Sequence, residues 1–121
     1  MKNQSQERSR KTVAVDFDGV LSLYNGDSSQ PPGPPVPKAQ KFVEQLLKKR
    51  LEVVIFSSRE QGTIKQWLED YGFPPLPIFY KPPVLALIGD RAVRFQGTFA
   101  GLSQAIWERP WWHDKAKQEE A

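Results

Sequence analysis

Two carboxylates stand two positions apart in the stretch VAVDFDGVLS, where an apolar run ends at Asp16 and a glycine follows Asp18. Carboxylate oxygens are ligands for a hard cation such as Mg²⁺, which binds oxygen at about 2.0 to 2.1 Å in a near-octahedral array. A cation held by such a pair would also bind an anionic substrate. These two residues therefore favour a metal-assisted reaction of an anionic substrate.

Three further polar residues, Ser57, Lys81 and Asp90, each come shortly after an apolar run. Each of them alone is a common turn, capping or solvated residue. Together with the two carboxylates they add a hydroxyl and an ammonium group. A phosphoryl group needs such neighbours, because its transfer depends mainly on positioning and on neutralising the charge of its oxygens. The set as a whole predicts phosphate chemistry.

The elements that must position these residues alternate between strand and helix. Short apolar runs predict buried strands, and apolar residues at helical spacing predict amphipathic helices. This alternation predicts a three-layer, Rossmann-like α/β fold, a parallel sheet with helices on both faces. Ligands of such sheets bind beyond the carboxyl ends of the strands, where the polar residues stand. The predicted strands are residues 12–16, 51–56, 76–79, 84–88 and, shorter, 93–95, and the predicted helices are residues 38–50, 61–71 and 101–109.

Local sequence signals predict the structure of three segments in more detail. Phe42, Val43, Leu46 and Leu47 are the apolar residues at helical spacing in the first helix. The dipeptide at position 25, Asn-Gly, predicts a small hairpin flap after the first strand. The five prolines of residues 30–37 predict a stiff, extended linker.

The length and composition of the chain exclude several classes of protein. A chain of 121 residues has the size of one domain, which we assign to residues 12–109, with a disordered polar tail at 1–11 and a second tail at 110–121. The absence of cysteine excludes disulfides and thiolate metal sites, and the cytoplasm is the expected location. No apolar run approaches the roughly 18 residues that span a bilayer, so no membrane partner is expected. A net charge of +3 is too mild to indicate nucleic acid.

Four stretches in order resemble the motifs of the haloacid dehalogenase (HAD) superfamily of phosphotransferases. DFDGV is similar to its first motif, VVIFSSR to its second, KPP to its third and LIGD to its fourth, and the resemblance covers about residues 12–95. It implies a HAD-like fold and a Mg²⁺-dependent phosphomonoester hydrolase that works through an aspartyl-phosphate. The segments after the first two motifs leave no room for a cap domain. The resemblance thus implies a small, capless phosphatase with an open site and an unknown phosphorylated substrate, of which a macromolecular or nucleotide phosphate is one kind.

The resemblance also implies a role for each motif residue. Asp16 resembles the nucleophile, and Asp18 the general acid and base, whose backbone carbonyl also ligates the metal. Ser57 resembles the phosphate-binding hydroxyl, with Ser58 as the alternative if the strand runs one residue longer. The implied catalytic residues are Asp16, Asp18, Ser57 and Lys81, the phosphate-binding residues are Asp16, Gly19, Ser57, Ser58 and Lys81, and the metal ligands are Asp16, Asp18 and Asp90.

The fourth motif departs from the family pattern, which usually shows two acids. Gly89 stands where an acid adjacent to Asp90 would stand, and residues 91–94 contain no acid either. The alternative hypothesis is therefore a noncatalytic binding module that keeps the fold. A phosphorelay receiver domain is disfavoured, because Lys81 precedes another predicted strand and its acid.

Residues outside the motifs carry weaker predictions. Arg59 and Arg91 also follow predicted strands and rank below the motif residues as substrate contacts. Near the end of the chain, tryptophans are predicted to pack back on the domain, or, if exposed, to form a homodimer contact or a cover for the open site. A histidine beside them is predicted to be solvated. These residues are Trp107, Trp111, Trp112 and His113.

Overall fold

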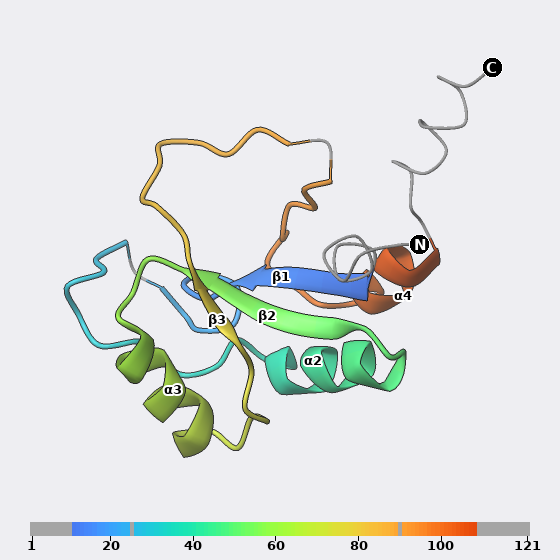
Figure 1. Cartoon of the computed structure of the whole chain (residues 1–121), viewed down its shortest axis with the longest axis horizontal. Helices are drawn as coiled ribbons and strands as arrows, with labels where there is room; N and C mark the ends of the chain where they lie inside the picture. Colours follow the sequence, from blue (N-terminus) through green and yellow to red (C-terminus); the bar gives the residue numbers. More distant parts are fainter. Residues whose placement is uncertain (1–10, 25, 90, 109–121) are drawn as a thin grey trace, which may run out of the picture.

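The computed structural model describes residues 11–24, 26–89 and 91–108. Three parallel strands form one sheet in the order β1 (Thr12–Asp16), β2 (Glu52–Ser57) and β3 (Ile78–Tyr80). Helix α2 (Ala39–Lys48) links β1 to β2, and helix α3 (Gln61–Asp70) links β2 to β3 (Figure 1). Helix α4 (Leu102–Glu108) follows and contacts α2. The predicted Rossmann-like α/β class is confirmed at this level.

The strands end together at one edge of the sheet. Asp16 pairs with Phe56, and Ser57 pairs with Tyr80. Because all three strands are parallel, their carboxyl ends face the same side, and the segments that follow them start side by side. The fold thus provides the edge at which the candidate residues were expected to meet.

A single apolar core holds the helices against the sheet. Helix α2 contributes Phe42, Val43 and Leu46, all buried. Leu47, expected on the same face, is instead 37 % exposed, because it lies at the margin of the stripe centred on its three neighbours. From α3, Trp67 meets Phe17 edge to face, with ring centroids 4.9 Å apart. Burying side chains of this size stabilises the fold by about 1.5 to 3 kcal/mol each.

Burial is uneven between the two faces of the sheet. Val15, Val53 and Ile55 lie on the face that joins the core. On the other face Ala14 is exposed and Phe56 is only half-buried. The helical cover expected on both faces is therefore incomplete within the described ranges.

The proline-rich stretch is part of the packed domain, so its interpretation as a linker is corrected. The backbone N–H of Leu23 donates to the carbonyl of Pro34, and that of Val36 donates to Leu21, each at 2.8 Å. The indole Nε1 of Trp67 donates to the carbonyl of Gly33, also at 2.8 Å. These bonds close a loop over residues 21–36 and fix it against α3. The predicted flap turns at Asn25, which lies outside the described residues.

The predicted fourth and fifth strands are wrong in this structure. Residues 84–88 and 93–95 form no strand, and the side chains of Leu85 and Ile88 are 104 % and 97 % exposed. Pro82 and Pro83 precede this segment and offer no N–H donors for a ladder with a neighbouring strand. In the order β1-β2-β3 of the described strands, β3 is therefore an edge strand of the sheet.

The two ends of the chain are described only in part. Trp107 of α4 is 51 % exposed, and the Nζ atom of Lys49 lies 5.5 Å from its ring centroid. Trp111, Trp112 and His113 lie outside the described residues, as does most of the predicted N-terminal tail. Within the described part of the chain, no helix has the length and apolar character needed to cross a bilayer.

Candidate functional site

The turn after β1 sets the position of the two carboxylates. The carbonyl of Phe17 accepts hydrogen bonds from the backbone N–H groups of residues 20–22, at 3.0 to 3.3 Å. Gly19 has a φ of 81°, which glycine adopts at little cost, and its N–H donates to the carbonyl of Ser22 at 2.8 Å. The chain therefore curls back on itself directly after the strand. Asp18 lies inside this turn, two residues beyond Asp16.

Asp16 and Lys81 form an ion pair across the edge of the sheet. The Nζ atom of Lys81 donates to Oδ1 of Asp16 at 2.9 Å, although 65 residues separate them in the chain. The backbone N–H of Lys81 donates to the carbonyl of Ser57 at 2.9 Å, which continues the β2–β3 ladder. The side chain of Asp16 is 42 % exposed, so an incoming molecule can reach it. Asp16 and Lys81, which were expected to converge at the carboxyl ends of the strands, therefore meet there.

Ser57 and Ser58 occupy different environments. β2 ends at Ser57, one residue later than predicted. The hydroxyl oxygen of Ser57 is buried and accepts from the backbone N–H of Arg59 at 3.1 Å. Ser58 is exposed on the wall of a pocket. Among the described side chains, neither hydroxyl is hydrogen-bonded to Asp16 or Lys81.

Arg59 forms an ion pair with Asp18, whereas the sequence predicted it only as a lower-ranked substrate contact. Its Nε atom lies 2.8 Å from both carboxylate oxygens of Asp18. One terminal nitrogen donates to the carbonyl of Gln30 at 2.9 Å and to that of Ser28 at 3.3 Å. The Arg59 side chain is only 9 % exposed and that of Asp18 is 19 % exposed, so water screens this pair weakly. The signal available in the sequence was the position of Arg59 just beyond a strand end.

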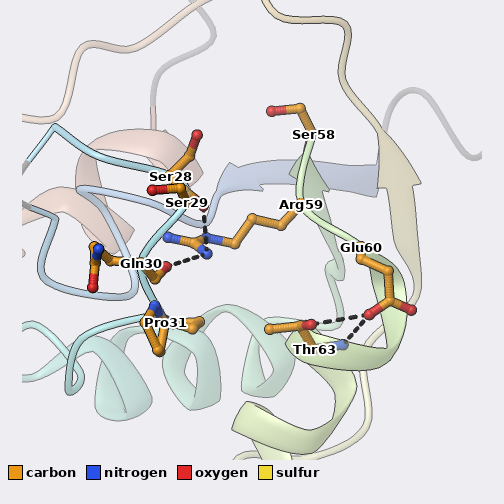
Figure 2. A pocket seen from close by; sticks show the side chains of 9 residues that line it. Ser28, Ser29, Gln30, Pro31, Ser58, Arg59, Glu60 and Thr63 are labelled. Atoms are coloured by element: carbon orange, nitrogen blue, oxygen red, sulfur yellow. Dashed lines mark hydrogen bonds between the residues drawn. The ribbon is translucent and has the colours of Figure 1, made fainter.

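A pocket of about 510 Å³ opens next to this ion pair. One wall is the loop segment 28–32, and the other is formed by residues 58–60 and Thr63. Figure 2 shows the Arg59 side chain extending from the second wall toward the first. Arg59 is therefore shared between the pocket that it lines and the ion pair with Asp18.

Two carboxylates, Glu60 in the wall of this pocket and Asp27 in the loop, are strongly hydrogen-bonded. Glu60 caps α3 and accepts from the backbone N–H groups of Gly62 and Thr63, each at 3.0 Å, and from the Thr63 hydroxyl. These bonds lower the pKa of Glu60 below its ordinary value of 4.5. Bonds from the hydroxyl and the backbone N–H of Ser29 lower the pKa of Asp27 in the same way. Both groups are negatively charged at neutral pH.

Asp16 and Asp18 offer oxygen atoms of the kind that Mg²⁺ prefers as ligands. Among the described residues, Oδ2 of Asp16 and the backbone carbonyl of Asp18 have no hydrogen-bond partner. The described residues contain no cluster of three or more Asp, Glu or His side chains that could together hold a metal ion. Asp90, the third predicted ligand, lies outside them, and its neighbour Arg91 is exposed. The two described oxygens are thus of the kind that Mg²⁺ binds, but they make up only part of a ligand set.

Comparisons with known proteins bear on the fold. No family model matches the chain, and the search of curated proteins gave no significant match. Among solved structures, the chain is similar to a structural-genomics target from Vibrio cholerae, with a TM-score of 0.60. The two sequences are 19 % identical over 92 % of this chain and 99 % of that one. At this level of identity the likeness supports the α/β architecture over nearly the whole length of both chains, and nothing about activity.

Proposed function

We propose that the protein is a small, capless member of the HAD superfamily, a phosphomonoester hydrolase that works through an aspartyl-phosphate on Asp16. The observation that carries the proposal is the half-exposed carboxylate of Asp16 at the sheet edge, 2.9 Å from the ammonium group of Lys81. A nucleophile for phosphoryl transfer needs access to substrate and a nearby positive charge, and this pair provides both. The order of the four motif-like stretches supports the same proposal.

Each residue of the edge has a task in this reaction. An oxygen of Asp16 forms a bond to phosphorus while the bond from phosphorus to the leaving oxygen breaks. Lys81 offsets negative charge on the phosphoryl oxygens and the repulsion between them and the carboxylate. A serine hydroxyl, from Ser57 or Ser58, donates a hydrogen bond to a phosphoryl oxygen. Water then attacks phosphorus, which releases inorganic phosphate and restores Asp16.

Asp18 moves the protons of this reaction. In the first step the leaving oxygen takes a proton from Asp18, and in the second step Asp18 takes a proton from the attacking water. Arg59 fixes the orientation of the Asp18 carboxylate through its Nε atom. Without this contact, Asp18 would sample rotamers in which it cannot reach the leaving oxygen.

The proposed cofactor is Mg²⁺, which Asp16, Asp18 and Asp90 would hold through oxygen atoms. When bound, it neutralises and orients phosphoryl oxygens. The missing second acid at Gly89 leaves more ligand positions to water, which Mg²⁺ commonly retains.

The proposal of a capless protein is supported by the size of the connections. The loop over residues 21–36 is closed by backbone hydrogen bonds between its two ends, and β2 is joined to β3 through α3. Neither connection holds a domain. A site without a cap admits substrates of many sizes, including macromolecules.

The decisive experiment is the release of inorganic phosphate from p-nitrophenyl phosphate, with Mg²⁺ or with a chelator. We expect Mg²⁺-dependent release that falls by at least about a hundredfold in Asp16→Asn, because the variant lacks the attacking oxygen. Asp70→Asn is the matched control, because Asp70 is exposed on α3 and bonds only to Gln66 among the described residues. Equal rates in Asp16→Asn and wild type would contradict the proposal. No release by the folded wild type with any divalent metal would favour the binding module.

A further inference from the structure

We propose that the pocket between residues 28–32 and Thr63 binds the leaving group of the substrate, and that it selects small, hydroxylated, non-aromatic alcohols such as sugars and polyols. This inference rests on the proposed phosphatase function and goes beyond it, because it names a substrate class and the residues that select it. Its support comes from the position of the pocket, its size and the chemistry of its walls.

The position of the pocket follows from Arg59. This side chain lines the pocket and at the same time lies 2.8 Å from the carboxylate of Asp18. Because the leaving oxygen receives its proton from Asp18, it must come within hydrogen-bond distance of that carboxylate. In this proposal the atoms attached to the leaving oxygen extend past Arg59 and reach the pocket that its side chain lines.

The size of the pocket suits a small molecule. Its volume of about 510 Å³ falls within the range of roughly 300 to 1,000 Å³ that is typical of small-molecule sites. Its outer wall includes Pro31 and Pro32, whose fixed φ angles limit the movement of the loop. Arg59 fixes the same wall through the carbonyls of Ser28 and Gln30. These contacts limit the movement of this wall of the pocket.

The chemistry of the walls favours hydroxyl groups. The hydroxyls of Ser28 and Ser58 have no hydrogen-bond partner among the described residues and lie on opposite walls, as Figure 2 shows. Each can donate to and accept from a ligand hydroxyl. The side chains that line the pocket include no aromatic ring, so a nucleobase or an aryl group finds nothing to stack on. The carboxylate of Glu60, which lines the pocket, disfavours a leaving group with a second negative charge.

The experiment compares three phosphate compounds at saturating Mg²⁺: glucose 6-phosphate, phenyl phosphate and acetyl phosphate. We expect kcat/KM of the wild type to be higher for glucose 6-phosphate than for phenyl phosphate, although phenolate is the better leaving group. The variant Ser28→Trp fills the pocket with a bulky ring and keeps the backbone carbonyl that Arg59 binds. We expect it to reduce kcat/KM for glucose 6-phosphate about tenfold more than for the small acetyl phosphate.

The control and the contrary outcomes separate this inference from the proposed function. Gln96→Trp adds the same bulk at an exposed position outside the pocket, and we expect it to leave all three rates unchanged. An equal effect of Ser28→Trp on glucose 6-phosphate and acetyl phosphate would overturn the leaving-group pocket and leave the phosphatase intact. A wild-type preference for phenyl phosphate would do the same. Turnover of none of the three compounds by the folded wild type would overturn the proposed function itself.

Discussion

Arg59 connects two parts of the site that the sequence keeps apart. Its guanidinium group bonds to Asp18 in the turn after β1 and to two carbonyls of the loop over residues 21–36. The planar fork of arginine suits this arrangement, because its nitrogens donate in fixed and different directions. One side chain therefore determines both the orientation of Asp18 and the shape of the neighbouring pocket.

Replacing Arg59 tests this dual role. We expect Arg59→Met to lower the free energy of unfolding by about 2 to 3 kcal/mol, somewhat less than for a fully buried pair, because Asp18 keeps some contact with water. We expect Arg59→Lys to be more stable than Arg59→Met but still about tenfold reduced in kcat, since one ammonium group cannot satisfy Asp18 and the loop together. Urea unfolding and phosphate release measure the two effects.

The control for Arg59 is Arg94, which is exposed. We expect Arg94→Met to change the free energy of unfolding by less than about 0.5 kcal/mol. If Arg59→Met unfolds at the same urea concentration as the wild type, the ion pair with Asp18 does not stabilise the fold. If Arg59→Lys keeps the kcat of the wild type, Arg59 has a structural role only.

The sequence predicted part of the site and missed another part for a physical reason. The pairing of Asp16 with Lys81 followed from the rule that parallel strands present their carboxyl ends at one edge. The contact of Arg59 with residues 28–30 depends on where a long loop packs, and no local pattern encodes that. Which hydroxyl meets a ligand, Ser57 or Ser58, depended on a single residue of strand length.

Helices α2 and α3 end in the same backbone arrangement but with different residues. In each case the residue after the C-cap has a left-handed φ, 63° at Arg50 and 73° at Gly72. The residue after that donates its N–H to a carbonyl of the last turn, at 3.2 Å from Leu51 and 2.9 Å from Phe73. This is the Schellman motif, which glycine fits best because it has no Cβ. Arg50 therefore carries a strain that Gly72 does not.

Substitutions at Arg50 and Gly72 should change the free energy of unfolding in opposite directions. We expect Arg50→Gly to raise the free energy of unfolding by about 1 kcal/mol, since the Arg50 side chain is exposed and the left-handed cost of a non-glycine residue is removed. We expect Gly72→Ala to lower it by about 1 kcal/mol for the converse reason. Glu44→Gly, at an exposed position in the middle of α2, should also lower it by about 1 kcal/mol, which would show that the gain is specific to the position after the C-cap. Thermal unfolding measures all three, and a loss of stability in Arg50→Gly would contradict this account.

The extent of the sheet is the feature of the whole molecule that the sequence predicted least well. The strands and helices up to Tyr80 were predicted with ends within a few residues, because their apolar patterns are reinforced by glycine, proline and charged neighbours. Residues 84–88 have an apolar pattern of the same kind. A pattern of this length indicates that a segment can be buried but not which partner it finds, and no described strand pairs with these residues.

Substitutions in this segment show how far the core extends. Because the side chains of Leu85 and Ile88 are exposed, we expect Leu85→Ser and Ile88→Ser each to change the free energy of unfolding by less than about 0.5 kcal/mol. Leu46→Ala is the comparison within the core, where a fully buried leucine is lost, and we expect a decrease of about 3 kcal/mol in urea unfolding. A decrease of similar size in Leu85→Ser would mean that residues 84–88 pack as a fourth strand in solution. Asp90 would then follow a strand end, as its proposed role as a ligand for Mg²⁺ requires.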